Sequence, residues 1–299
     1  VPLENYKTSN SIKDFFFGKQ VDTDQIAISS YEIKNDSIFY YPYLGDGLTG
    51  ELSQISLSQW TDKDVAKDEI ENKFVFEKTF RLGTDAYGRD FFSRLIIGTR
   101  ISFMIGFIAV FISLFVGIPI GAIGGYYRGK TDEFIMWLIN VVWSIPTLLL
   151  VIAITLALGK GFWQIFVAVG LTMWVEVARV VRGQFISYRE SEFVEAARAL
   201  GFSDMRIVFK EILPNVLAPV IVISAANFAA AILVESGLSF LGIGAQPPTP
   251  SWGNLIKENY SHIVIGDAHL ALFPGIAIML LVLAFNVFGN VLRDAFDVK

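Results

Sequence analysis

ISFMIGFIAVFISLFVGIPIGAI, residues 101–123, is an uncharged run of 23 mostly apolar residues. A helix of this length reaches about 35 Å at roughly 1.5 Å per residue, which is enough to cross the apolar core of a bilayer, about 30 Å thick. The whole chain is similarly apolar, since 53% of its 299 residues are hydrophobic and only 18% are charged. A soluble domain of this length would be more polar. The stretch therefore predicts an all-α polytopic membrane protein.

Four further apolar runs raise the number of spans expected in the chain to five. They are residues 134–158, 162–181, 215–241 and 270–292. Pro146 is expected to kink the second span. The third is the least apolar because it holds Glu176 and Arg179, whose spacing allows them to pair on one helix face, so we expect a structural role for both.

Positive charges in the short connections predict the orientation. One set of connections holds ten Lys and Arg residues: Arg128, Lys130, Arg179, Arg182, Arg189, Arg198, Arg206, Lys210, Arg293 and Lys299. The opposite set holds only Lys160 and Lys257. Because cytoplasmic loops are enriched in Lys and Arg, the first set and the C-terminus are expected in the cytoplasm. Five crossings then place the N-terminal residues outside, and we expect a sixth span upstream of Val1 to carry them there.

Residues 1–81 are expected to form a small extracellular region of mixed α/β structure, followed by a transmembrane domain over 82–299. Residues 1–98 carry 16 Asp and Glu against 11 Lys and Arg, so the acidity of the chain lies here. Short alternating pieces and turn residues predict strands, and a helix is expected around 61–73. At GTDAYGRD (83–90) we expect a helix start capped by Thr84 or Asp85, with an interfacial ion pair.

The segment between the third and fourth spans has a helical pattern. SEFVEAARALGFSDMRIVFKEILPN (191–215) predicts two short helices that meet at Gly201, the first capped by Ser191 and the second followed by Pro214 at the entry to the next span. Apolar residues at helical spacing predict one apolar face of the first helix. They are Phe193, Ala196, Ala197 and Leu200.

Six residues of this segment resemble the EAA motif of importer-type ABC transporter permeases: Glu195, Ala196, Ala197, Gly201, Leu213 and Pro214. Glu211 stands where the general motif has isoleucine, a variant similar to the peptide and nickel branch of these importers. Other segments look like the C-type membrane subunit of the dipeptide/oligopeptide importers. They are LGTDAYGRDFFSRLIIGTRISF (82–103), SIPTLLL (144–150), LSFLGIGAQPPTPSWG (238–253) and ALFPG with LAFNVFGNVLRDAFD (271–297).

The resemblance implies a type I ABC importer permease fold, with a cytoplasmic coupling loop over 183–214 that docks on a separate ATPase subunit. It implies import of di- and oligopeptides through a bacterial cell membrane, with an extracellular substrate-binding protein, a second homologous permease and two ATP-binding subunits as partners. ATP and Mg²⁺ are expected on those subunits, so this chain is expected to be no enzyme and to bind no cofactor, metal or nucleic acid.

GGYYRGKT (124–131) matches the spacing of a phosphate-binding loop, yet we expect no ATP there. Such a loop needs a strand before it and a helix after it, whereas a membrane span precedes this one. Gly121 and Gly125, together with Gly117, are expected instead to form a stripe of small residues for close helix contact.

Glu235, inside the fourth span, leaves two interpretations open. A carboxylate within a membrane faces a cavity or a partner, so it either lines the substrate path and meets the amino group of a peptide or forms a structural contact, which we favour. Nickel or another small solute is the alternative cargo, although two histidines and no cysteine give little support for metal ligands. An ion-coupled transporter has no need of an EAA loop, and a membrane enzyme would need a nucleophile-base or metal constellation that the sequence lacks.

Overall fold

A computed structural model of the chain describes residues 26–34, 37–45, 48–56, 75, 77, 79–159, 162–245 and 249–296. The helix expected around 61–73 lies outside these residues. The chain separates into two compact units. The first joins the residues up to Ile97 with Glu258–Leu270, and the second, here called the helical unit, comprises Gly98–Lys257 and Ala271–Lys299.

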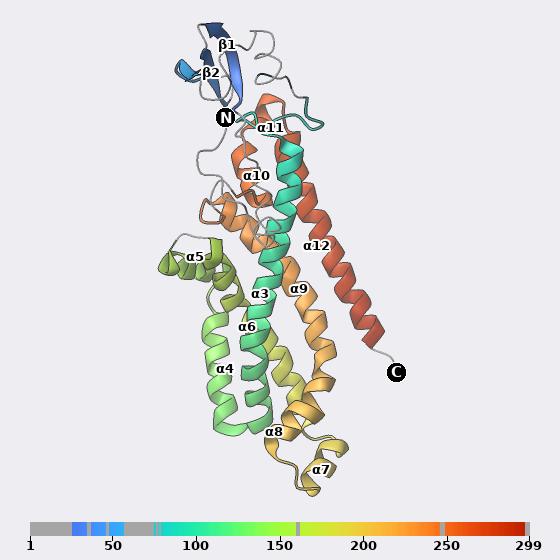
Figure 1. The fold of residues 1–299 in the computed structure, drawn as a ribbon. Helices are drawn as coiled ribbons and strands as arrows, with labels where there is room; N and C mark the ends of the chain where they lie inside the picture. Colours follow the sequence, from blue (N-terminus) through green and yellow to red (C-terminus); the bar gives the residue numbers. More distant parts are fainter. Residues whose placement is uncertain are drawn as a thin grey trace. The chain divides into compact units, whose positions relative to one another are not determined.

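The described chain has four helices long and apolar enough to cross a membrane, or five if one bent pair counts as a single span. The four are α3 (Phe91–Tyr127), α6 (Phe162–Tyr188), α9 (Leu213–Phe240) and α12 (His269–Phe296). The bent pair is α4 (Gly129–Trp143) and α5 (Thr147–Leu158). The five predicted spans are therefore confirmed as helical segments in the predicted order (Figure 1).

At Pro146 the second span is divided into two separate helices. α4 ends before it and α5 begins after it, and their axes meet at 90°. Proline has no backbone N–H and disfavours helical geometry in the residue before it, and here Pro146 itself lies outside the helix at φ −53° and ψ 124°. The Ser144 hydroxyl donates to the Val141 carbonyl at 2.8 Å and closes the end of α4. The predicted kink is confirmed, and its form is an elbow between two helices.

α3 and α6 lie in close backbone contact along the glycine stripe of α3. A Cβ at Gly117 would lie 2.7 Å from the carbonyl oxygen of Trp174 on α6, and one at Gly121 or Gly125 would meet the backbone of α6 as closely. Close backbone approach of this kind is how small residues hold transmembrane helices together. The predicted stripe is confirmed.

The stretch GGYYRGKT forms the last turn of α3, a turn at Arg128 and the start of α4. Arg128 has φ 55°, a backbone conformation that is uncommon for a residue with a side chain. The adjoining Gly129 also has positive φ, and the two residues together reverse the chain direction.

α12 packs beside α9 in the helical unit (Figure 1). The rings of Phe228 on α9 and Phe285 on α12 stack with centroids 3.8 Å apart. α3 and α12 also expose large apolar side chains, among them Phe111, Phe115 and Leu283. Such faces suit lipid or another membrane subunit.

The N-terminal residues form a small antiparallel sheet, which confirms the predicted strand and turn structure. Its strands are β1 (Ile28–Lys34), β2 (Ser37–Gly45), β3 (Leu48–Thr49) and β4 (Ser53–Ser56). β2 pairs with the other three, and its Ile38 is buried. The same compact unit includes the end of α10 (Trp252–Asn259) and α11 (His262–Ile265).

Candidate functional site

The segment between α6 and α9 lies at the end of the helical unit where α3 passes into α4 (Figure 1). It consists of α7 (Glu192–Ala199), α8 (Asp204–Arg206) and the π-helical segment η2 (Ile207–Ile212). The second predicted helix is not a separate one, because α8, η2 and α9 form a continuous helix from Asp204 to Phe240. A π segment before Pro214 has a physical reason: the wider turn accommodates a residue that has no N–H and whose ring would clash with the preceding turn.

Gly201 ends α7, as predicted. Its φ of 77° is a left-handed conformation that glycine adopts without steric cost. The N–H of Phe202 then donates to the Ala197 carbonyl at 3.1 Å, the long hydrogen bond of a Schellman motif. Ser191 occupies the position before the helix, but its hydroxyl donates back to the Tyr188 carbonyl and does not cap α7, so the predicted side-chain cap is wrong.

We expect Gly201→Ala to destabilise the turn after α7 by about 1–2 kcal/mol, because a side chain disfavours the left-handed conformation. A Cβ at Gly201 would meet no atom within 4 Å, so the effect would come from the backbone alone. Gly183→Ala is the matched control, since its Cβ would also meet nothing, but it lies inside α6, where alanine is favoured. Hydrogen exchange of the α7 amides should be faster in the first variant only, and equal exchange in both would contradict this account of Gly201.

The apolar face predicted for α7 is only partly buried within the chain. Val194 and Ala197 are buried against Ile207, Ile212 and other residues of α3, α6 and α9. Three of the four residues of the predicted apolar face are exposed: Phe193, Ala196 and Leu200. Most of the predicted apolar face therefore lies on the surface of the chain.

Polar contacts hold the segment and its neighbours in place. The Tyr126 hydroxyl at the end of α3 donates to the Asp204 carboxylate at the start of α8, with 2.6 Å between the oxygens. Arg128 pairs with Glu190 at 2.6 Å. On the adjoining helices, Arg182 and Asp132 form a two-pronged ion pair, and its longer hydrogen bond is 2.6 Å. These contacts tie the segment to the end of α3, and its second part continues directly into α9.

The six residues of the predicted motif fall within this one segment. Glu195 and Ala196 are exposed on α7, Ala197 is buried, Gly201 forms the exposed turn, Leu213 is half-buried and Pro214 is exposed at the start of α9. Glu195 and Ala196 thus lie on the same exposed side of the segment as Phe193 and Leu200. Sequence reasoning missed Met205 and Phe209 as members of this surface, where they are 62% and 56% exposed.

Glu235 lies in a buried polar cluster of the helical unit. Its side chain is fully buried, and the Ser239 hydroxyl donates to one of its oxygens at 2.6 Å. The Ser251 hydroxyl lies 3.2 Å from that of Ser239. The carboxylate therefore faces protein atoms in this structure, which fits the structural interpretation better than the substrate path.

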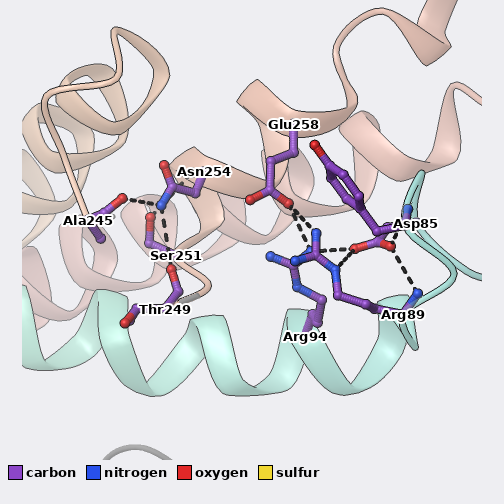
Figure 2. A network of polar contacts seen from close by, with 9 residues as sticks. Asp85, Arg89, Arg94, Ala245, Thr249, Ser251, Asn254 and Glu258 are labelled. Atoms are coloured by element: carbon purple, nitrogen blue, oxygen red, sulfur yellow. Dashed lines mark hydrogen bonds and ion pairs between the residues drawn. The ribbon is translucent and has the colours of Figure 1, made fainter. Parts of the chain in front are cut away.

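The loop before α10 contributes to the same region through Asn254 (Figure 2). The amide of Asn254 donates to the carbonyls of Ala245 and Thr249. Sequence reasoning missed this residue and Ser251, because a lone Asn or Ser in a loop carries no pattern.

A charged cluster occupies the first compact unit (Figure 2). Asp85 is 3% exposed and accepts hydrogen bonds from the backbone of Arg89, the Arg89 side chain at 2.7 Å and the Arg94 guanidinium. Glu258 binds both arginines at 2.8 Å. The predicted ion pair is confirmed, but the predicted cap is wrong, because α3 begins after Asp90, whose carboxylate accepts from the backbone N–H of Phe92.

Glu176 and Arg179 are near enough to interact electrostatically, yet none of the ion pairs among the described residues joins them. The Arg179 guanidinium lies instead over the Trp143 ring, 3.6 Å from its centroid. Glu176 itself is exposed in this chain. Glu176 and Arg179 therefore interact electrostatically but do not form the expected ion pair.

The apolar spans and the helical loop exposed between two of them define a membrane-embedded permease subunit. Residues 117–299 match the family described as the binding-protein-dependent transport system inner membrane component, and the chain belongs to this family. It is 42% identical over 242 residues to the glutathione transport system permease protein GsiD of Escherichia coli O6:K15:H31, covering 79% of this chain and 80% of that one. It is also 42% identical over 217 residues to the dipeptide transport system permease protein DppC of Alkalihalophilus pseudofirmus, covering 73% and 71%.

The fold agrees with the family. A chain of the MetNI methionine ABC transporter in an inward-facing conformation superposes with a TM-score of 0.57 at 20% identity, covering 69% of this chain and 97% of that one. The chain is thus a multi-pass membrane permease subunit of an ABC importer and not itself an enzyme. Membership of the family implies ATPase and substrate-binding partners and a second permease.

Proposed function

We propose that this subunit carries di- and oligopeptides into the cell, from an extracellular binding protein to the cytoplasm. The dipeptide and glutathione systems of its relatives both transport small peptides, and the chain matches each over more than two thirds of its length. Nickel import is the weaker alternative, since the described residues contain no group of three or more His, Cys, Asp or Glu side chains that would hold a metal ion.

The coupling to ATP hydrolysis is proposed to run through a coupling surface, which we define as Phe193, Glu195, Ala196, Leu200, Met205 and Phe209. The single observation that carries this proposal is the exposure of its large apolar side chains, which reaches 73% at Leu200. An amphipathic helix that offers apolar residues to a groove is a common mode of protein recognition. The groove would belong to one of two ATPase subunits, which bind ATP and Mg²⁺.

Movement of this surface would reach the membrane spans along two routes. α8 continues without a break into α9, so a tilt of the loop would tilt that helix. The hydrogen bond between Tyr126 and Asp204 joins the loop to the end of α3. Gly201, Leu213 and Pro214 shape the segment and do not themselves form the contact.

The orientation is proposed from charge. The coupling loop (183–214) and the C-terminus lie in the cytoplasm of a bacterial cell, and residues 1–81 lie outside, ahead of a permease domain over 82–299. The excess of Lys and Arg on the loop side supports this assignment.

Purification of the native complex tests the proposal. We expect two ATPase subunits and a second permease to copurify, and we expect peptide-loaded binding protein to stimulate ATP hydrolysis in the reconstituted complex. Stimulation by nickel and not by peptides would favour the alternative cargo. Transport that persists without any ATPase and after ATP depletion would instead identify an ion-coupled transporter.

A further inference from the structure

The elbow between α4 and α5 divides the bent pair of helices that together count as one span. Its residues 143–149 are exposed in this chain, including the non-helical turn at Ser144–Pro146. Backbone that leaves the helix at membrane depth is tolerated only where protein covers it or where it lines a water-filled cavity. The exposed elbow therefore does not face lipid.

Glu176 independently indicates that this side of the helical unit does not face lipid. It lies at the middle of α6, which runs from Phe162 to Tyr188, and it is exposed. An ionisable residue at this depth faces a partner or water, because its exposure to hydrocarbon is costly. The neighbouring cation, Arg179, is held on the Trp143 ring, and no ion pair neutralises Glu176 within the described chain.

The two features meet in one hollow of about 150 Å³. Trp143, Ile145 and Thr147 from the elbow line it together with Thr172 and Glu176 from α6. At about 30 Å³ for each water molecule, the space holds a handful of waters. It suits one charged group with part of its hydration shell and is too small for a whole peptide.

We propose that this hollow opens on the aqueous transport path and that Glu176 binds the primary ammonium group of the passing substrate. The carboxylate supplies the negative charge, and the hydroxyls of Thr147 and Thr172 supply further acceptors. The apolar wall of Trp143 and Ile145 excludes part of the water and so strengthens the charge interaction. This inference rests on the proposed import of peptides and names one residue that selects among them.

Thiol labelling tests whether the hollow faces water. The chain has no cysteine, so Glu176→Cys introduces its only thiol. In the assembled complex we expect this thiol to react with a charged, water-soluble thiosulfonate. Phe115→Cys is the control on the exposed face of α3, near the level of Glu176 because Gly117 contacts Trp174 and Val177 of α6, and we expect it to stay unlabelled. Absence of labelling at position 176 would mean that another subunit covers the hollow, and this would overturn the proposal.

Uptake of paired substrates tests the recognition. The same complex in vesicles is given a dipeptide with a free amino terminus and its N-acetylated form. We expect Glu176→Gln to lower kcat/KM for the free-amine peptide about tenfold or more, the size of a lost hydrogen bond to a charged group, and to leave the acetylated peptide unchanged. Glu133→Gln, an exposed carboxylate at the start of α4 and away from the hollow, should change neither.

The outcomes separate the two proposals. If the wild-type complex takes up peptides and Glu176→Gln affects both substrates equally or not at all, recognition by Glu176 is wrong and peptide import stands. If the wild-type complex binds its ATPase but takes up neither peptide, peptide import is wrong and the role of Glu176 falls with it.

Discussion

Replacing Leu200 and Met205 together by aspartate should release the ATPase from the complex and abolish ATP-driven uptake, while the chain stays folded in the membrane. The two side chains are 73% and 62% exposed, so neither contributes to the buried core. Apolar anchors at the centre of an interface are worth about 2 kcal/mol or more each, and a carboxylate buried in their place adds a desolvation cost. We expect the affinity for the ATPase to fall at least a hundredfold, which corresponds to roughly 3 kcal/mol or more.

Copurification of the tagged chain with its ATPase measures this effect. Leu48→Asp is the matched control, because Leu48 is 65% exposed but lies in the N-terminal sheet, outside the coupling surface. It should leave the ATPase attached. Glu195→Gln should weaken attachment less, since an exposed charge contributes less than an apolar anchor. Normal binding and uptake by the double aspartate variant would show that this surface does not couple the chain to ATP hydrolysis.

The sequence predicted the spans well because their signal is local. Long uncharged runs, the kink expected at Pro146 and the turn at Gly201 each follow from a few adjacent residues. The glycine stripe was also predictable, since residues four apart share one face of a helix. Each of these patterns is local, so it can be recognised without knowing any other part of the chain.

The buried face of α7 was not predictable in the same way. Two overlapping apolar sets share this short helix, one around Val194 and one around Phe193 and Leu200. Periodicity shows that a helix has an apolar side, but it does not show whether that side meets its own chain or another. In a subunit built to bind partners, the more apolar set is exposed.

The charged cluster around Asp85 could not be predicted from the sequence for a different reason. Its partner Glu258 is distant in the sequence, and only the fold brings it to Arg89 and Arg94. The sequence showed a local Asp–Arg pair, whereas the structure shows two carboxylates that share two guanidinium groups. Such a network is a tertiary feature, and its energetic importance follows from its burial.

Asp85→Ala is therefore expected to destabilise the first compact unit by about 3–5 kcal/mol, the range found when one member of a buried ion pair is removed. The change would leave the guanidinium groups of Arg89 and Arg94 sharing one carboxylate, and it would leave the backbone N–H groups of Tyr87 and Arg89 without their acceptor. Opening of this unit should make the chain segment around Asp85 accessible to protease. Since each 1.4 kcal/mol is a factor of ten in population, digestion there should become at least a hundredfold faster.

An exposed ion pair with the same 2.8 Å separation as the pairs of Glu258 provides the control. Lys34 and Glu32 lie 2.8 Å apart on β1 with side chains 61% and 64% exposed, so water already solvates both charges. Glu32→Gln should change the digestion rate by less than about fivefold, because exposed ion pairs contribute little. Equal sensitivity of the two variants would mean that charge alone matters in this unit. A large effect confined to Asp85→Ala would instead show that the buried network, and with it the contact between the start of α3 and the end of α10, holds this unit together.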